Sequence, residues 1–398
     1  MSDALSALGE ACENVREALP EEGVLGVAPS FVAAPRTVAE AAGVLRAAAD
    51  LGLAVVPRGN ETRLDWGGPP TRCDLLLDTG GLDRVIEHAA GDLVVKVEAG
   101  LSMERLAEVL GRHGQRLALD VPLPGSTVGG TLAAGAGGPS RLLYGSARDL
   151  LIGVTMVRAD GAIAKAGGKV VKNVAGYDLG KLLTGSFGTL GVIVEAAFRL
   201  HPLPEARVHV TRACDDVEEA HAAVQRVLHS LHVPAAIEID GGDGRWTVGV
   251  LLEGVPQGTA ARAEAVATLL GPSAEVADAP PPWWGAYPSG NTLIEVTAPP
   301  TALPRLAATA RNGVVRGSAG LGSWHVGFDA AEPAPVADLL AALRREVPGT
   351  AVVRYAPEAV RQEIDLWGPV PALALMRRLK DQFDPGHRLS PGRFVGGI

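Results

Sequence analysis

The hydrophobic residues in the first half of the chain fall into short runs of the length expected for buried strands. Strands are predicted where these runs occur, at 54–56, 75–77, 93–97, 150–157 and 190–196. A helix is predicted over 39–53, because its alanine and leucine residues recur with a period near 3.6. The first 25 residues also suggest an amphipathic helix, with Leu5, Leu8 and Val15 on one side.

Strand-like and helical runs alternate in the second half of the chain, beginning at residue 206. The predicted strands are 235–239, 246–252, 292–296 and 324–328, and the predicted helices are 217–228, 260–270, 301–310 and 336–345. Two strand–helix–strand passages favour an α+β cap domain with an antiparallel sheet over 206–350. A further helix is predicted over 373–383.

Glycines are unusually dense between residues 120 and 200, beside the predicted strands. Glycine weakens strands and helices, so this density requires an explanation. The backbone could approach a large flat ligand and donate N–H groups to its phosphates, or the glycines could simply mark turns. The density alone leaves both interpretations open. The loop 57–62 is a second candidate phosphate site, although strands commonly end at proline or glycine.

Composition and charge exclude several classes of protein. With 398 residues the chain is long enough for two domains, and 47% hydrophobic with 20% charged residues is ordinary for a soluble enzyme. The net charge of −9 and the lack of a long basic run argue against nucleic acid as a partner. No apolar stretch is long enough to cross a bilayer. The N-terminus lacks the basic cluster of a signal peptide, so a cytoplasmic location is expected.

The cysteines and lysines limit the chemistry further. Cys12, Cys73 and Cys214 are widely separated and form no C-x-x-C pair, so neither a disulfide framework nor an iron–sulfur cluster is expected. Four of the six lysines lie between Lys165 and Lys181. They could form a solvated face or supply counter-charge for a phosphate or a small carboxylate substrate.

Four glycine-containing motifs follow one another in a specific order. They are GSTVGGT at 125–131, GPSRLLYG at 138–145, KNVAGYDL at 172–179 and GSFGTLGVI at 185–193. Together they resemble the PCMH-type FAD-binding domain of the vanillyl-alcohol oxidase flavoproteins. Within that family they are most similar to the FAD-binding subunits of bacterial glycolate oxidases, which are related to D-lactate and D-2-hydroxyglutarate dehydrogenases. A Rossmann fold is not expected, because no G-x-G-x-x-G opens a helix after the first strand.

The resemblance covers roughly residues 30–205 and returns at the C-terminus. It implies an α+β fold with a two-subdomain FAD-binding domain over 1–205 and the smaller cap over 206–350. The segment 351–398 would then return to the FAD-binding domain, through a motif that begins at Phe383-Asp384-Pro385. Ser390 stands in this motif where the family usually has asparagine.

The resemblance also implies which residues hold FAD, and they lie in four segments of the chain. These residues are Pro57, Arg58, Gly59, Asn60, Glu61, Thr62, Pro124, Gly125, Ser126, Thr127, Gly129, Gly130, Ala133, Ala134, Gly137, Tyr144, Gly145, Gly188, Gly191, Val192 and Ile193. FAD is expected to be non-covalent, because the family's attaching histidine is absent from the loop 57–62.

Three positions depart from the family pattern at the expected cofactor site. Asn60 and Glu61 replace glycines, and a carboxylate beside a pyrophosphate is electrostatically unfavourable. Either Glu61 points into solvent or it weakens FAD binding. Phe187 stands where the family often has glutamate, which removes a charge from the expected flavin edge.

The resemblance implies an FAD-dependent oxidoreductase acting on a small 2-hydroxy acid such as glycolate or D-lactate. Catalytically complete relatives carry a metal-binding His-x-Gly-Asp-Gly-Asn-x-His cluster. The most similar segment of this chain, Ser323–Asp329, has one histidine. No metal site and no assigned catalytic residue are therefore expected; His325 is a weak candidate base, with a packed strand position as the alternative.

Three functions remain open at this point. The first is an FAD subunit that works with a sister FAD subunit and an iron–sulfur subunit, reaching the membrane only indirectly through a partner. The second is a non-catalytic FAD-fold subunit that stabilises a complex or relays electrons. The third is a self-sufficient oxidase that uses oxygen.

Overall fold

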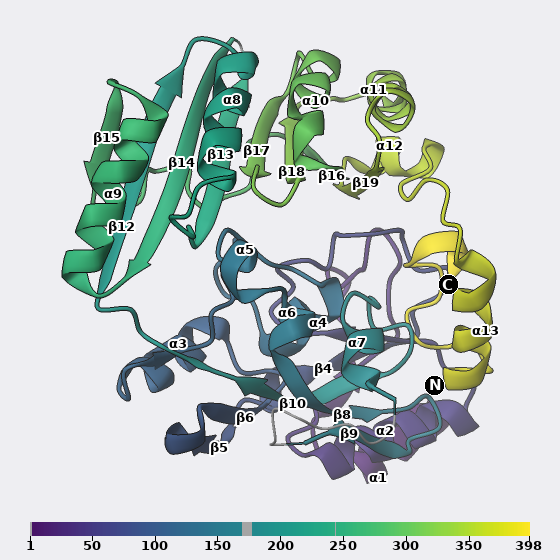
Figure 1. Ribbon diagram of the computed structural model, residues 1–398. Coiled ribbons are helices and arrows are strands. Elements are labelled where there is room, and N and C mark those ends of the chain that lie inside the picture. The colour runs from purple at the N-terminus through teal and green to yellow at the C-terminus, as the bar shows by residue number, and fades with distance from the viewer. Residues whose placement is uncertain (1, 169–176, 243) are drawn as a thin grey trace. The chain divides into compact units, whose positions relative to one another are not determined.

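The computed structural model describes residues 2–168, 177–242 and 244–398, and the chain divides into two compact units (Figure 1). The first unit comprises Met1–Ala136, Ser146–Pro202 and Val370–Ile398, and the second comprises Gly137–Gly145 and Leu203–Pro369. This division differs from the predicted one by three residues at the junction near residue 205, and more substantially in two other places. Gly137–Gly145 belongs with the cap, and the chain returns to the first unit at Val370 instead of residue 351.

The first unit contains a four-stranded sheet in which parallel strands are covered by two helices. Its strands lie in the order β1 (Val15–Glu17), β2 (Phe31–Ala33), β4 (Leu75–Asp78) and β3 (Val55–Arg58), and only β1 is antiparallel. Helices α1 (Ser2–Ala11) and α2 (Val38–Asp50) pack Leu8, Val44 and Leu45 into its core. Thr37 caps α2 by accepting a hydrogen bond from the Glu40 N–H.

The predicted N-terminal helix is therefore too long. The helix ends at Ala11, and Val15 lies in β1, where it pairs with Ala33 of β2. Leu8 is completely buried, as the amphipathic pattern required, but Val15 is placed by pairing with a distant strand. Tertiary pairing has overridden a local helical pattern here.

A five-stranded antiparallel sheet forms the second half of the first unit. Its strands lie in the order β5 (Val85–Ala89), β6 (Val94–Glu98), β10 (Val192–Arg199), β8 (Leu151–Val157) and β9 (Ile163–Gly167). The short helices that share its core are α3 (Met103–Gly111), α4 (Val128–Ala134), α6 (Ala147–Leu150) and α7 (Leu179–Leu183). Ser102 caps α3 and Asp178 caps α7. A small ladder joins β7 (Gln115–Arg116) to β11 (His201–Pro202).

The C-terminal segment completes the first unit. Helix α13 spans Leu373–Phe383, as predicted, and the residues after it pair with β3. The Val55 N–H donates to the Arg388 carbonyl at 2.7 Å, and the Ser390 N–H donates to the Val55 carbonyl at 2.8 Å. The yellow C-terminal helix and the purple N-terminal helices in Figure 1 thus belong to one unit.

The second unit is built on an eight-stranded antiparallel sheet that consists of two equivalent halves. Each half has the element order β-α-β-β-α-β, and the two halves meet where β13 pairs with β17. The strands lie in the order β15 (Ala274–Ala277), β12 (Ala206–Cys214), β14 (Arg245–Gly254), β13 (Ala236–Gly242), β17 (Val314–Ser318), β18 (Ser323–Phe328), β16 (Thr292–Thr297) and β19 (Thr350–Tyr355).

Four helices pack their apolar faces against this sheet and form one core with it. They are α8 (Val217–Leu228), α9 (Pro256–Leu270), α10 (Leu303–Thr309) and α11 (Pro333–Glu346). Two shorter helices, α5 (Arg141–Tyr144) and α12 (Glu358–Glu363), belong to the same unit. The predicted α+β class and antiparallel cap sheet are confirmed. No helix in the described ranges is long and apolar enough to span a membrane.

Candidate functional site

The loop after β3 is the first wall of a cavity in the first unit. A β-carbon added at Gly59 would lie 2.5 Å from the Thr127 Oγ1, so glycine allows the loop to approach the start of α4. The Asn60 amide donates to the Gly125 carbonyl at 2.9 Å, and the Thr62 and Ser126 hydroxyls lie 3.2 Å apart. These contacts fix the loop against the glycine-rich segment that precedes α4.

Helix α4 provides the second wall. Thr127 caps it by accepting a hydrogen bond from the Gly130 N–H. The Gly129 N–H donates to the Ala99 carbonyl at 2.7 Å, and a β-carbon at Gly129 would lie 2.9 Å from the Ala99 β-carbon. Close approach of α4 to the chain after β6 therefore depends on the absence of a side chain at 129.

The loop that leads into β10 provides the third wall. Phe187 and Gly188 both have positive φ, at 55° and 72°. The Phe187 ring stacks on Phe394 with their centroids 5.4 Å apart. A β-carbon at Gly188 would lie 3.0 Å from Pro57 and 3.3 Å from the Ser390 hydroxyl, so this loop touches both β3 and the C-terminal tail.

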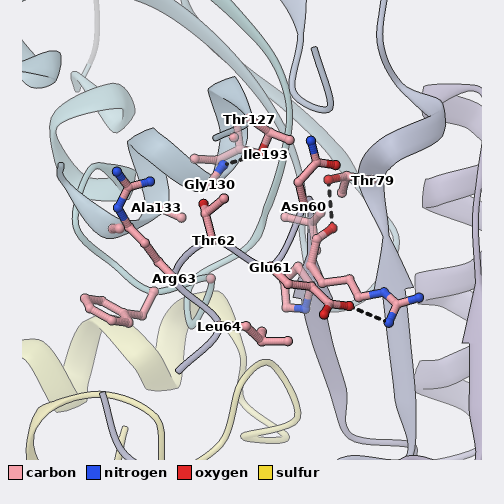
Figure 2. Close-up of a pocket in the computed structure, with 18 of the residues that line it drawn as sticks. Asn60, Glu61, Thr62, Arg63, Leu64, Thr79, Thr127, Gly130, Ala133 and Ile193 are labelled. Atoms are coloured by element: carbon pink, nitrogen blue, oxygen red, sulfur yellow. Dashed lines mark hydrogen bonds and ion pairs between the residues drawn. The ribbon is translucent and has the colours of Figure 1, made fainter. Parts of the chain in front are cut away.

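These walls enclose an empty volume of about 780 Å³, including space open to solvent (Figure 2). We call it the FAD pocket, after the cofactor that the sequence predicts to bind there. The residues that line it are Pro57, Arg58, Gly59, Asn60, Glu61, Thr62, Arg63, Leu64, Thr79, Thr127, Gly129, Gly130, Ala133, Ala134, Phe187, Gly188, Gly191, Val192, Ile193 and Arg393.

The structure brings together most of the residues predicted to hold FAD. All predicted residues from Pro57–Thr62, from α4 and its cap, and from Gly188–Ile193 line the FAD pocket. Pro124, Gly125 and Ser126 do not line it, and the latter two support the loop after β3 by hydrogen bonds.

Gly137, Tyr144 and Gly145 are not among the residues that line the FAD pocket, and they belong to the second unit. The Tyr144 hydroxyl donates to Glu253 of β14 at 2.8 Å, and its ring packs near Ala235, Ala236 and Leu251. Burial of this ring against the cap sheet determines where Gly137–Gly145 lies. The glycines of this segment did not indicate that position in the sequence.

Five pocket residues were not in the predicted set: Arg63, Leu64, Thr79, Phe187 and Arg393. Thr79 could have been found from its place directly after β4, because β4 is parallel to β3 and both strands end at the same edge. Arg393 is 4% exposed and donates to the Leu64 and Trp66 carbonyls at 2.9 Å. No local pattern links it to a loop more than 300 residues earlier.

Glu61 forms an ion pair with Arg58 at the edge of the FAD pocket. Its carboxylate accepts a hydrogen bond from Arg58 at 2.8 Å, drawn as a dashed line in Figure 2, and its side chain is 53% exposed. Arg58 also contacts Glu22 at 3.0 Å and Asp78 at 3.2 Å. Three carboxylates thus surround one guanidinium, and the backbone of Glu61 has a φ of 60°, a value that favours glycine.

We expect Glu61→Gly to tighten FAD binding about fivefold, because it removes a negative charge from the pocket edge, worth about 1 kcal/mol. It also removes the β-carbon from a left-handed backbone conformation. Titration of the apoprotein with FAD, followed by flavin fluorescence, measures the affinity. Glu61→Gln is the matched control, because it removes the charge and keeps the strained backbone. Weaker binding in both variants would show that the ion pair with Arg58 supports the loop.

Glu22 connects the N-terminal segment to Arg58 and should contribute to stability in a pH-dependent manner. Arg16 at 2.6 Å lowers the pKa of Glu22 to about 2, with help from the Leu19 N–H and Arg58 and against the effect of burial. A carboxylate with a lowered folded-state pKa stabilises the protein above its unfolded value of 4.5, and this contribution is lost as pH falls towards about 2.

We therefore expect Glu22→Gln to lose about 1 to 2 kcal/mol of unfolding free energy at pH 7, after discounting for solvent screening, and much less at pH 2. Urea unfolding at both pH values measures the difference. Glu21→Gln, at the exposed neighbouring position, is the control and should show no such pH dependence. An equal loss at both pH values would contradict the ionic origin of the effect.

His325 is not among the residues that line the FAD pocket and belongs to β18 of the second unit. Its Nε2 is 3.6 Å from the Glu295 carboxylate, and its ring packs edge-on against Tyr287. Burial opposes ionisation of Glu295, but Arg354 and His325 outweigh it and hold the pKa of Glu295 well below its usual range. His325 is thus a packed strand residue within a charged cluster. In the described ranges, no three His, Cys, Asp or Glu side chains are grouped to hold a metal.

The clustered lysines do not gather at the FAD pocket as far as the structure describes them. Lys181 pairs with Asp178 at 3.4 Å on α7, and Lys165 is exposed on β9. Lys169 and Lys172 lie outside the described residues. The solvated-face interpretation therefore fits Lys165 and Lys181.

Residues 29–167 match the family described as FAD binding domain. The chain is 34% identical over 213 residues to the glycolate oxidase subunit GlcD of Bacillus subtilis, covering 53% of this chain and 45% of that protein. It is 34% identical over 210 residues to D-lactate dehydrogenase of Archaeoglobus fulgidus, covering 52% and 46%. An FAD-linked oxidoreductase of Mycobacterium tuberculosis is 27% identical over 419 residues, covering 92% and 91%. The matches to the first two span about half of each relative.

Solved structures share the fold along nearly the whole chain. 4-Ethylphenol oxidase from Gulosibacter chungangensis superimposes with a TM-score of 0.74 at 18% identity, covering 98% of this chain and 96% of that one. The BBE-like 1 protein of Physcomitrella patens gives a TM-score of 0.69 at 16% identity, covering 97% of each chain. The architecture is thus the PCMH-type, vanillyl-alcohol oxidase-like fold.

The FAD pocket fits the cofactor that the matched family binds. Its backbone cradle depends on glycines at 59, 129 and 188, where a β-carbon would collide with neighbouring walls. The loop after β3, α4 and the loop before β10 together provide backbone that a phosphate-bearing, flat ligand can approach. Residues 29–167 accordingly form an FAD binding domain, the cofactor is FAD, and the matches support assignment of the chain as an FAD-dependent oxidoreductase.

Proposed function

We propose that this chain is the FAD-binding subunit of a glycolate or D-2-hydroxyacid dehydrogenase. The observation that carries the proposal is the FAD pocket, together with matches to a glycolate oxidase subunit and to D-lactate and D-2-hydroxyglutarate dehydrogenases. FAD bound there would supply the redox chemistry for oxidation of the hydroxy acid to a 2-oxo acid, a reaction in which the α-carbon loses a hydride and the hydroxyl group loses a proton.

The residues of the chain supply binding and orientation. The backbone from Gly59 to Thr62, which lines the pocket, would hold the phosphates. The start of α4 would support this loop, because the Gly129 and Gly130 N–H groups already donate to the Ala99 carbonyl and the Thr127 hydroxyl. The Asn60–Gly125 and Thr62–Ser126 contacts keep these two segments in place. The stacked rings of Phe187 and Phe394 shield one wall from water and carry no charge of their own.

The electrons taken from the substrate must pass to an acceptor, and we propose that a partner subunit provides it. The three cysteines are each buried in a different place and lie in separate cores or strands, so they cannot act together as iron–sulfur ligands. A complex with a sister FAD subunit and an iron–sulfur subunit would supply the missing ligands. In such a complex the protein would work in the cytoplasm and meet the membrane only through a partner.

A non-catalytic FAD-fold subunit is the second candidate. The three carboxylates around Arg58 favour it, because they place negative charge beside the expected pyrophosphate position. A self-sufficient oxidase is the third alternative, since sequence and fold do not determine the electron acceptor.

The decisive experiment is an absorption spectrum of the purified chain before and after addition of glycolate or D-lactate. We expect a flavin spectrum, and acid precipitation should leave the yellow colour in the supernatant. Colour in the pellet would contradict non-covalent binding, and no affinity for added FAD would support the non-catalytic subunit without cofactor.

Turnover of the two hydroxy acids with an artificial dye is then compared for the lone chain and for the chain co-expressed with its genomic neighbours. We expect activity only in the second preparation. Full dye-linked turnover by the lone chain would refute the need for a complex, and rapid turnover with oxygen alone would identify a self-sufficient oxidase.

A further inference from the structure

A single lysine in helix α13 is completely buried and uses all three of its N–H donors. The Lys380 Nζ lies 2.8 Å from the Asp384 Oδ2, 2.8 Å from the Thr189 carbonyl and 2.8 Å from the Leu389 carbonyl. Asp384 is also completely buried, and its Oδ2 accepts a second hydrogen bond, from the Leu389 N–H at 2.7 Å. Lysine has three donors and no acceptor, so this ammonium group is fully satisfied.

The two carbonyls belong to different walls of the FAD pocket. Thr189 follows Gly188 directly in the loop that leads into β10, and Gly188 lines the pocket. Leu389 precedes Ser390, whose N–H donates to Val55 at the start of β3. Lys380 therefore connects the glycine loop on one side to the tail that is paired with β3 on the other.

Burying the charge of Lys380 costs free energy, so its role differs from that of an apolar core side chain. Burial lowers the pKa of Lys380, and the Asp384 carboxylate opposes that effect. A buried ion pair contributes little net stability compared with apolar side chains of similar size. What an apolar side chain cannot do is fix two separate backbone segments through their carbonyls.

We propose that Lys380 is a positioning residue of the FAD site, which holds the tail after α13 and the loop 186–191 in register with each other without touching the cofactor. This inference rests on the proposed FAD site. Neither Lys380 nor Asp384 lines the pocket. Their effect on FAD is expected to pass through Gly188, Ser390 and Pro57, which meet where the two walls touch.

The first test is Lys380→Met, with Lys181→Met as a matched control. Lys181 also pairs with an aspartate of its own helix end, but its side chain is 50% exposed and does not line the pocket. FAD titration should give a Kd at least about tenfold higher for Lys380→Met, the scale of one charge-assisted hydrogen bond. The control should leave the Kd unchanged.

Limited proteolysis gives a second readout that does not depend on activity. Trypsin can cut after Arg388 and Arg393 in the tail, and bound FAD should protect both sites in the wild type. In Lys380→Met we expect faster cleavage at these two sites and little protection by FAD. Cleavage elsewhere in the chain should keep its wild-type rate.

The double variant Lys380→Met with Asp384→Leu tests whether the effect of Lys380→Met on FAD binding is only a folding defect. It removes both charges, so no buried charge is left without a partner, and it should remain folded although the Leu389 N–H and the two carbonyls lose these hydrogen bonds. We expect its Kd for FAD to remain raised about tenfold or more. A folded double variant with wild-type affinity and wild-type tail protection would overturn the inference while leaving the proposed function intact. Failure of the wild type itself to bind FAD would overturn both.

Discussion

Replacement of Gly188 by alanine is expected to weaken FAD binding by more than about tenfold. Gly188 has a φ of 72°, where a β-carbon costs roughly 1–2 kcal/mol. That β-carbon would also lie 3.0 Å from Pro57 and 3.3 Å from the Ser390 hydroxyl, so the contact between two pocket walls would have to open. The strain mainly lowers stability. The loss of affinity comes from opening the contact, because Gly188 itself lines the pocket, and a loss above 1.4 kcal/mol exceeds a factor of ten.

Gly185→Ala is the matched control for this substitution. Gly185 has a similar φ of 79°, but a β-carbon there would meet no atom within 4 Å. It should therefore lose a similar amount of unfolding free energy to backbone strain while keeping its affinity for FAD. Equal affinities for the two variants would show that contact between the walls does not determine binding.

Replacement of Arg354 by leucine is expected to cost about 3 kcal/mol of stability in the second unit. Arg354 donates to Glu295 at 2.8 Å, and the two side chains are only 17% and 22% exposed. Without Arg354, the Glu295 carboxylate still has the His325 Nε2 at 3.6 Å, but it has lost its guanidinium partner. A lowering of the melting temperature by roughly 6–12 °C is expected for a unit of this size.

Arg345→Leu provides the control for that experiment. Arg345 also meets a glutamate at 2.8 Å, but its side chain is 69% exposed. An exposed pair of this kind is worth about 0–1 kcal/mol. A similar loss of stability in both variants would show that the buried Arg354–Glu295 pair adds no more stability than an exposed pair.

The local hydrophobic pattern of the sequence was sufficient to predict the elements that bury one continuous apolar face. Helices α8 and α13 begin and end at the predicted residues, because their apolar periodicity is uninterrupted and each has a clear boundary. Strands β8 and β16 were found within a residue of their ends for the same reason. The glycine motifs similarly indicated most of the pocket lining, since glycine is required wherever walls approach closely.

Local pattern failed for strands with exposed or charged faces. β12, β15, β17 and β19 lie in the cap sheet and were not predicted. In β12, His209 and Arg212 interrupt the apolar residues, and in β15 Glu275 and Val276 are exposed. Their place is determined by backbone pairing with neighbouring strands, which no short window of sequence contains.

The sequence by itself predicted the class of fold, the cofactor and most of the residues that line the FAD pocket, because its ordered glycine motifs, which resemble those of a flavoprotein family, are short and local. Only the tertiary structure decided that Gly137–Gly145 belongs to the cap, that Arg58 gathers three carboxylates, and that Lys380 joins two walls of the pocket. These relations connect residues up to 191 positions apart, as between Lys380 and Thr189. They arise from burial and hydrogen-bond satisfaction across the folded chain, which are properties of the packed core and cannot be assigned to any one segment.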